Sequence, residues 1–231
     1  PARSFRFSLA GWTVLLALSF WGVAHSMQEV SVFNAYLAFG SVILMWGWHE
    51  LAFLTGWITG PRKTPLDAGV TGWPRFVQSV QVMLYHELAL LVNFAILWWM
   101  QEGQASHVAI CTFALLWCMR LSAKLNLFFG VPQNGAQYLP PHLVYLASYF
   151  KTRLITPWFV ISISAAIGAW CWLVWQAQQG AMAITAGWVM LATLLGLAIV
   201  EHLIMIFPLP LERLWGWAMG QSAKPALTTP P

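Results

Sequence analysis

Charged side chains are scarce in this chain, which has 11 Lys or Arg and 7 Asp or Glu among 231 residues. They make up 8% of the sequence, whereas a soluble domain usually carries about 25%. Disordered segments combine high charge with low hydrophobicity, but 59% of these residues are hydrophobic. The composition therefore excludes both an ordinary water-soluble domain and a disordered chain.

Several motifs that would identify an enzyme class are also missing. The chain has no phosphate-binding or dinucleotide-binding glycine pattern and no nucleophile elbow,. His49-Glu50 lacks the second histidine of a zinc-protease helix,. The few basic residues form no stripe, so we expect no nucleic-acid partner. The cysteines have no metal-type spacing, and we interpret them as small buried hydrophobic residues. They are Cys111, Cys118 and Cys171.

Long apolar runs are what the chain has instead, and they predict an all-α, polytopic transmembrane helix bundle. A helix needs about 20 apolar residues to cross the hydrocarbon of a bilayer. No fixed-period repeat divides the chain, so residues 1–231 are expected to form a single bundle domain. Six runs are long enough to be spans: roughly 5–24, 33–58, 76–100, 107–129, 157–176 and 183–207.

The distribution of Lys and Arg predicts the orientation of the bundle. Basic residues occur in the loops 59–75 and 130–156 and near both chain ends, whereas the other three connections contain none. The positive-inside rule then places both termini and these two loops in the cytoplasm. A short amphipathic segment at 211–219 is expected to lie on the membrane surface as a helix.

Ionisable residues inside the spans form a pattern. His and Glu are adjacent in three spans, and the fourth span carries two cations. A charged group costs about 2.5–3.5 kcal/mol to insert, so a span tolerates one where it pairs or functions. At about 1.5 Å rise per residue these groups reach similar depths in the cytoplasmic half of the bundle, and we predict that they meet there. The charge cluster consists of Glu50, Glu87, Glu201, Arg120, Lys124 and Asn126, with His49, His86 and His202 beside it.

Three interpretations of this cluster stay open, and a proton relay or a transport function remains as a further alternative. The carboxylates could neutralise the two cations and lock the helices together, with the histidines as hydrogen-bonded spacers. Neutral imidazoles among Trp side chains would also suit axial ligation of a tetrapyrrole metal. A metal ion could be held instead, although adjacent residues lie about 100° apart on a helix and rarely reach one ion. The metal-ligand set would be His49, His86, His202, Glu50, Glu87 and Glu201.

His142 is a separate candidate, in the loop between the fourth and fifth spans. It follows Pro140-Pro141, which ends any preceding helix, and is expected to open a helix over residues 143–150,. By itself it is typical of a loop histidine at the membrane interface. We place it beside His49, His86 and His202 among the tetrapyrrole-binding candidates.

Several blocks of the sequence resemble a known family. The most specific are Arg120-Leu-Ser-Ala-Lys-Leu-Asn126 and Leu139-Pro-Pro-His142, and others run from Trp46 to Gly56 and from Glu201 to Pro210. Over residues 33–217 the chain resembles the photosynthetic complex assembly proteins of the PuhE type, found in purple phototrophic bacteria. Members of that family often have a further hydrophobic segment before the first span, so this chain is expected to be trimmed at its N-terminus.

The resemblance implies an accessory membrane protein for the biogenesis of the reaction centre and light-harvesting complexes, with a part in bacteriochlorophyll supply or delivery. It implies bacteriochlorophyll or a precursor as the tetrapyrrole. The implied partners are membrane lipid, reaction-centre or light-harvesting subunits and bacteriochlorophyll-synthesis proteins, in the intracytoplasmic photosynthetic membrane. It transfers no catalytic residue. Two alternatives stay open: a metal-dependent membrane oxidoreductase that uses the same His and Glu side chains, and a structural subunit of the mature complex.

Overall fold

The computed structural model describes residues 2–207, with side chains from residue 8 onward, and this range contains helices and no strands. The surface helix expected at 211–219 lies outside the described residues. The elements are, in chain order, α1 (Ala2–Ser26), α2 (Val32–Leu54), α3 (Gly72–Gln81), α4 (Leu84–Gln101), α5 (Val108–Phe129), the 3-10 helices η1 (Ala136–Tyr138) and η2 (Pro141–Tyr149), α6 (Pro157–Gln179) and α7 (Met182–Ile204).

Five of these helices are long and apolar enough to cross a membrane, namely α1, α2, α5, α6 and α7. The pair α3 and α4 makes a sixth if it counts as one bent span. Large apolar side chains cover the outward faces, as contact with lipid requires. Examples are Trp21, Trp98 and Leu197. The predicted all-α, polytopic class is confirmed.

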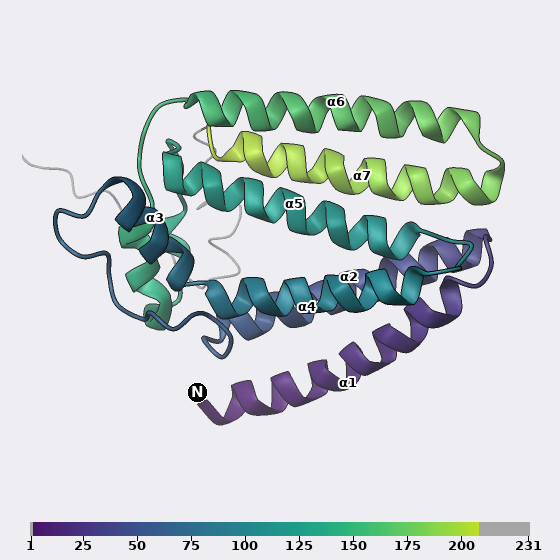
Figure 1. Cartoon of the computed structure of the whole chain (residues 1–231), viewed down its shortest axis with the longest axis horizontal. Helices are drawn as coiled ribbons and strands as arrows, with labels where there is room; N and C mark the ends of the chain where they lie inside the picture. Colours follow the sequence, from purple (N-terminus) through teal and green to yellow (C-terminus); the bar gives the residue numbers. More distant parts are fainter. Residues whose placement is uncertain (1, 208–231) are drawn as a thin grey trace, which may run out of the picture.

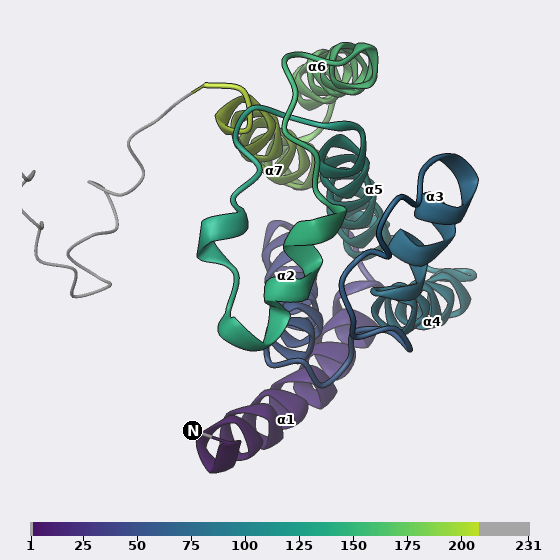
Figure 2. The same ribbon diagram turned by 90° about the vertical axis from the view of Figure 1, so that its left-hand side faces the viewer.

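The long helices run side by side along the longest axis of the molecule (Figure 1). α1 packs on α2 and α6 packs on α7, while α2 also contacts α4, α5 and α7. α2 is therefore the central helix, with α1 and α6 at opposite margins of the end view (Figure 2). Both loops that carry basic residues gather at one end of the bundle together with α3 (Figure 1). We call the end that holds the loops 59–75 and 130–156 the elbow end. The hairpin end is the opposite one, with the connections 27–31, 102–107 and 180–181. The cytoplasmic location of the elbow end stays a prediction.

Two of the helices begin at side-chain caps. The Ser31 hydroxyl accepts a hydrogen bond from the Asn34 backbone N–H at 3.1 Å, at the start of α2. Thr156 accepts from the Phe159 N–H at 3.3 Å, at the start of α6, where Pro157 takes the first helical position. Such caps satisfy backbone donors that the first turn leaves free. They also fix where the chain re-enters the bundle after each loop.

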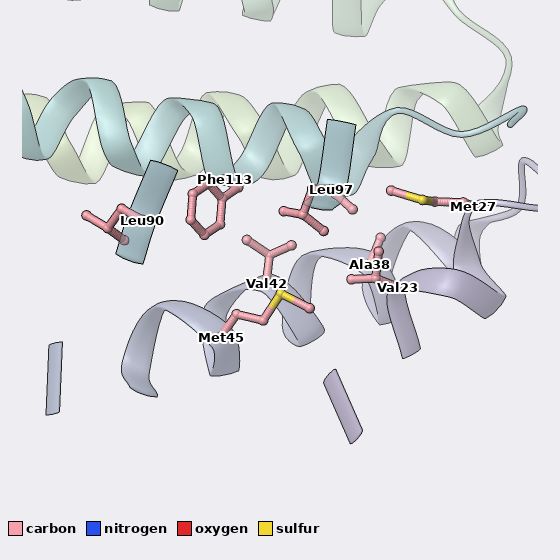
Figure 3. Packing of buried hydrophobic residues seen from close by; sticks show 9 residues of the cluster. Val23, Met27, Ala38, Val42, Met45, Leu90, Leu97 and Phe113 are labelled. Carbon is pink, nitrogen blue, oxygen red and sulfur yellow. The ribbon is translucent and has the colours of Figure 1, made fainter. Parts of the chain in front are cut away.

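The main apolar core lies between α1, α2, α4 and α5. Figure 3 shows Phe113 of α5 and Leu90 of α4 on one side of this core, with Val42 and Met45 of α2 facing them. These side chains are inaccessible to solvent. The core therefore fixes the positions of three helices that carry ionisable groups. Its buried members are Val23, Met27, Ala38, Val42, Met45, Leu90, Leu97, Ala109 and Phe113.

The third predicted span, residues 76–100, is not one continuous helix. α3 and α4 are bent by 65° at the break between them. The segment before α3 supplies the reason, because the His86 N–H donates to the Thr59 carbonyl at 3.0 Å and the Arg62 N–H donates to the Gln81 carbonyl at 3.5 Å. Backbone groups that a straight helix would pair internally are thus paired with residues 59–62. The second predicted span, 33–58, is also shorter than expected, since α2 ends at Leu54.

Arg75 attaches α3 to the rest of the elbow end. This side chain, expected in a loop, lies within α3, and the residue is only 4% exposed. Its guanidinium donates to the Phe128 carbonyl at 3.1 Å and to the Tyr149 carbonyl at 2.7 Å. It also lies 4.0 Å from the centre of the Phe128 ring. One buried cation therefore joins α3, α5 and η2.

A second cation, Arg62, holds the loop before α3. Its Nε donates to the Tyr149 hydroxyl at 2.8 Å, and its Nη2 lies 2.5 Å from a carboxylate oxygen of Asp67. These two contacts raise the pKa of Arg62, the hydrogen bond to Tyr149 contributing most. The helix expected at 143–150 forms as the 3-10 helix η2 and begins two residues earlier, at Pro141.

Candidate functional site

The predicted charge cluster divides between two faces of α5. Arg120 and Lys124, four residues apart, pair with residues of α2 and α4. Ser122 and Asn126, also four residues apart, bond to residues of α7 and α6. Residues four apart share a helix face, and a shift of two residues turns about 200°. The two sets are therefore separate polar sites.

The first face holds two ion pairs that link three helices. Arg120 Nη2 donates to Glu50 Oε2 at 2.9 Å, joining α5 to α2. Lys124 Nζ donates to Glu87 Oε1, joining α5 to α4. Trp117 Nε1 donates to the second oxygen of Glu87 at 3.1 Å. Two cations and two carboxylates thus neutralise each other inside the bundle, as the first of our three interpretations expects.

Two buried histidines lie beside these pairs. His49 is 4% exposed, and its Nε2 lies 2.9 Å from Asn93 Nδ2. Because an amide nitrogen only donates, Nε2 accepts this bond and links α2 to α4. His86 is 1% exposed and neither of its ring nitrogens has a partner among the described residues. Its ring packs against Phe53, with 4.8 Å between centroids, and Phe53 also lies 6.0 Å from Lys124 Nζ.

The second face is a hydrogen-bonded seam of neutral groups. His202 Nδ1 lies 2.8 Å from the Ala198 carbonyl, which only accepts, so Nδ1 carries the proton,. His202 Nε2 therefore accepts from the Ser122 hydroxyl at 3.0 Å. Asn126 Nδ2 donates to the Ser122 carbonyl at 3.0 Å and the Ser162 hydroxyl at 3.2 Å. This seam joins α5 to α6 and α7, as polar side chains between membrane helices commonly do.

Glu201 is placed apart from both sets. It is exposed and has no ion-pair or hydrogen-bond partner among residues 8–207, so it neutralises neither cation. It lines a cavity of about 290 Å³ between α2, α5 and α7, together with Glu50 and Arg120. In this cavity the predicted acid on α7 approaches the other charged groups.

The metal-binding interpretation requires several ligands at one point. Within the described part of the chain, no three His, Cys, Asp or Glu side chains converge as metal ligands. Glu50 and Glu87 are each held by a cation, and His202 lies on the other face of α5. The six-residue set that we considered is therefore not assembled in this arrangement.

The tetrapyrrole interpretation requires an imidazole with a free lone pair and an open face. The acceptor nitrogens of His49 and His202 are occupied by hydrogen bonds. His86 has free nitrogens within residues 8–207 but is enclosed. None of these three histidines within the spans fits an axial ligand in this arrangement.

His142 meets both requirements. It is exposed at the elbow end, and its Nε2 lies 2.8 Å from the Leu54 carbonyl. Since a carbonyl only accepts, Nε2 carries the proton and Nδ1 keeps the lone pair. Metal-ligating histidines commonly donate their other ring N–H to such a group. The ring rests on Gly56, which has a φ of +76° and where a Cβ would lie 3.0 Å from His142 Cδ2. Glycine thus provides both the turn after α2 and the space for the imidazole.

Comparison with known proteins identifies the family. The sequence pattern of the family described as "Protein of unknown function (DUF3623)" matches residues 1–226. The chain belongs to this family. A relative from Rhodobacter capsulatus, described as "Uncharacterized 30.4 kDa protein in puhA 5'region", is 38% identical over 225 residues, which cover 96% of this chain and 81% of that protein. No solved structure matches the chain.

Uncharged polar residues complete both sites of this DUF3623 chain, and they were not among the predicted site residues. Asn93, Trp117, Ser122 and Ser162 each supply a hydrogen bond to a predicted site residue. Three of them are polar residues that interrupt apolar runs, which is the signal that could have found them. Trp117 lies seven residues before Lys124 and so shares its helix face.

We expect Asn93→Leu to lower the free energy of unfolding by about 1–2 kcal/mol, because the buried His49 imidazole would lose its partner. Thermal unfolding in detergent measures the effect. The double variant His49→Leu with Asn93→Leu should lose less stability than Asn93→Leu alone, since it leaves no polar group unpaired. If Asn93→Leu has the same melting temperature as the wild type, the hydrogen bond between Asn93 and His49 does not stabilise the fold.

Proposed function

We propose that this chain is an accessory membrane protein in the biogenesis of the bacterial photosynthetic complex, with a part in supplying or delivering bacteriochlorophyll or a precursor. The observation that carries the proposal is the relative described by its place in the puhA 5' region, which is 38% identical over 96% of this chain. That position hints at a photosynthesis-related membrane protein. The resemblance of the Arg120–Asn126 and Leu139–His142 blocks to PuhE-type assembly proteins supports the same role.

His142 is the residue that we propose to contact the pigment. A bound tetrapyrrole would supply a metal that accepts an imidazole ligand and an absorbance that reports its surroundings. The chain contributes an imidazole whose proton is held on Nε2 by the Leu54 carbonyl at 2.8 Å. It also contributes an aromatic side chain, Tyr138, which is 41% exposed and lies in the same loop at the same end of the bundle. The proposed partners, reaction-centre or light-harvesting subunits and pigment-synthesis proteins, would meet the chain in the photosynthetic membrane.

Deletion of the gene in its phototrophic host tests the role in biogenesis. We expect the deletion to lower the near-infrared absorbance of isolated membranes per unit of membrane protein, and the wild-type gene to restore it. His142→Ala should restore it only in part. His107→Ala is the matched control, because His107 is also an exposed imidazole but lies at the hairpin end. A deletion strain with unchanged complex levels would overturn the proposed function.

Absorbance of the purified chain tests the pigment contact separately. Protein isolated in mild detergent from cells that make bacteriochlorophyll should carry a tetrapyrrole absorbance, and His142→Ala should lose most of it. A colourless wild-type preparation would exclude stable contact with the pigment. In that case a deletion phenotype would still support a role in assembly.

A further inference from the structure

The cavity between α2, α5 and α7 combines apolar walls with an uneven charge pattern. Its volume of about 290 Å³ lies near the lower limit of small-molecule sites,. The polar groups are Glu50, Arg120 and Glu201, which gives one cation and two carboxylates. Its apolar walls come mainly from α5 and α7, with Leu115, Leu116, Met119, Leu194 and Leu197.

The polar groups of this cavity are not fully satisfied by one another. Arg120 and Glu50 share a hydrogen bond of 2.9 Å, but Arg120 Nε and Glu50 Oε1 are both buried and without a partner among residues 8–207. Glu201 has no partner among the described side chains. A buried polar atom without a hydrogen bond costs about 1–3 kcal/mol. Glu201 is exposed and pays no such penalty, but its charge has no counterion among the described side chains. A ligand that brings a cation to Glu201 and an acceptor to the exposed part of the Arg120 guanidinium would complement this cavity.

The depths of the groups set the order of charges on such a ligand. Glu201 lies three residues before the end of α7, whereas Arg120 lies nine residues before the end of α5. At about 1.5 Å per residue, the Glu201 backbone lies about 4–5 Å from the elbow end of its own helix, and the Arg120 backbone lies about 13–14 Å from that of α5. The matching ligand is cationic at its outer tip and anionic further in, with apolar chains beyond. Leu197, which is 64% exposed, extends the apolar wall outward.

We propose that this cavity binds the headgroup of a phospholipid that carries a primary ammonium outside a phosphate, as in phosphatidylethanolamine. The phosphate accepts from Arg120, and the ammonium donates to the exposed carboxylate of Glu201. The acyl chains follow the leucine-lined surface of α5 and α7. The inference concerns this cavity alone and is independent of the role in photosynthetic biogenesis.

Charge and hydrogen bonding select this headgroup over other common ones. Phosphatidylglycerol has no cation, so its net negative charge would lie beside two carboxylates and be repelled. Phosphatidylcholine has a cation but no N–H, so it cannot donate a hydrogen bond to either carboxylate. The ethanolamine headgroup therefore complements both Arg120 and Glu201.

Native mass spectrometry of the full chain in detergent tests the proposal with three synthetic dioleoyl lipids: phosphatidylethanolamine, phosphatidylcholine and phosphatidylglycerol. We expect a one-to-one phosphatidylethanolamine adduct at about tenfold lower lipid concentration than for the other two, which is about 1.4 kcal/mol of preference. Glu201→Gln should remove most of this preference without lowering the melting temperature, because the Glu201 side chain is exposed and supports no other group among the described residues.

Glu102→Gln is the matched control, since it removes an exposed carboxylate at the hairpin end. It should keep the wild-type preference. Equal retention of the three lipids by the wild type would overturn the proposal. So would a Glu201→Gln variant that discriminates between the lipids as the wild type does.

Discussion

Gly60→Ala is expected to lower the free energy of unfolding by about 3 kcal/mol or more, through overlap with backbone atoms. A Cβ at this position would lie 2.6 Å from the Val82 carbonyl carbon and 2.8 Å from the Met83 nitrogen, and it would overlap the Gln81 carbonyl oxygen as well. Flexible side chains could turn away, but these atoms are the peptide units of the break between α3 and α4. The break or the segment before α3 must therefore move.

Gly40→Ala is the control for this substitution. Gly40 lies within α2, and a Cβ added there would meet no atom of the described residues within 4 Å. Alanine at this position should be neutral or stabilise the helix by up to about 1 kcal/mol, because alanine forms helices better than glycine. Thermal unfolding in detergent compares the two variants, and limited proteolysis reports cleavage in the 55–83 region. Equal melting temperatures for Gly60→Ala and the wild type would show that contacts of residues 59–62 do not stabilise the bend between α3 and α4.

The same break shows what hydrophobicity alone could predict. The run 76–100 is apolar enough to be one span, and the prediction of six spans follows from such runs. The bend arises because residues 59–62 form backbone hydrogen bonds with Gln81 and His86. These contacts are tertiary, and an apolar run contains no sign of them. Length and composition therefore predicted the number of apolar segments but not the path of the third.

The charged residues show a similar division. Insertion cost left pairing of the three carboxylates with the two cations as one open interpretation, and in the structure Glu50 and Glu87 pair with the cations of α5. Depth along the helix, however, says nothing about rotation or about which helices are neighbours. The offset of about 200° between Arg120 and Ser122 was readable from their spacing. The packing of α7 against the Ser122 face of α5 could not be read from the spacing. For this reason His202 was expected beside the ion pairs of Arg120 and Lys124, whereas it bonds to Ser122.

Arg120→Ala is the second substitution with a large expected effect, a loss of about 2–4 kcal/mol in the free energy of unfolding. Removal of one partner of an ion pair leaves the other charge uncompensated in a poorly solvated place. The side chains of Arg120 and Glu50 are only 32% and 22% exposed, and the surrounding surface is largely apolar. Thermal unfolding in detergent, followed by size-exclusion chromatography, measures the loss. Lys63→Ala is the control, because it removes an exposed cation outside the helices, and its melting temperature should equal that of the wild type.

The double variant Glu50→Leu with Arg120→Leu separates two sources of this loss. If the unpaired Glu50 charge causes it, the double variant should recover most of the stability, because apolar replacements for an ion pair are often neutral. If Arg120 acts mainly by packing its long side chain against α2, the double variant should be no more stable than Arg120→Ala. The lipid preference of the cavity should disappear in the double variant in either case, since the donor to the phosphate is gone. Stability and lipid selectivity would then respond differently to the same pair of residues, which a purely structural ion pair would not produce.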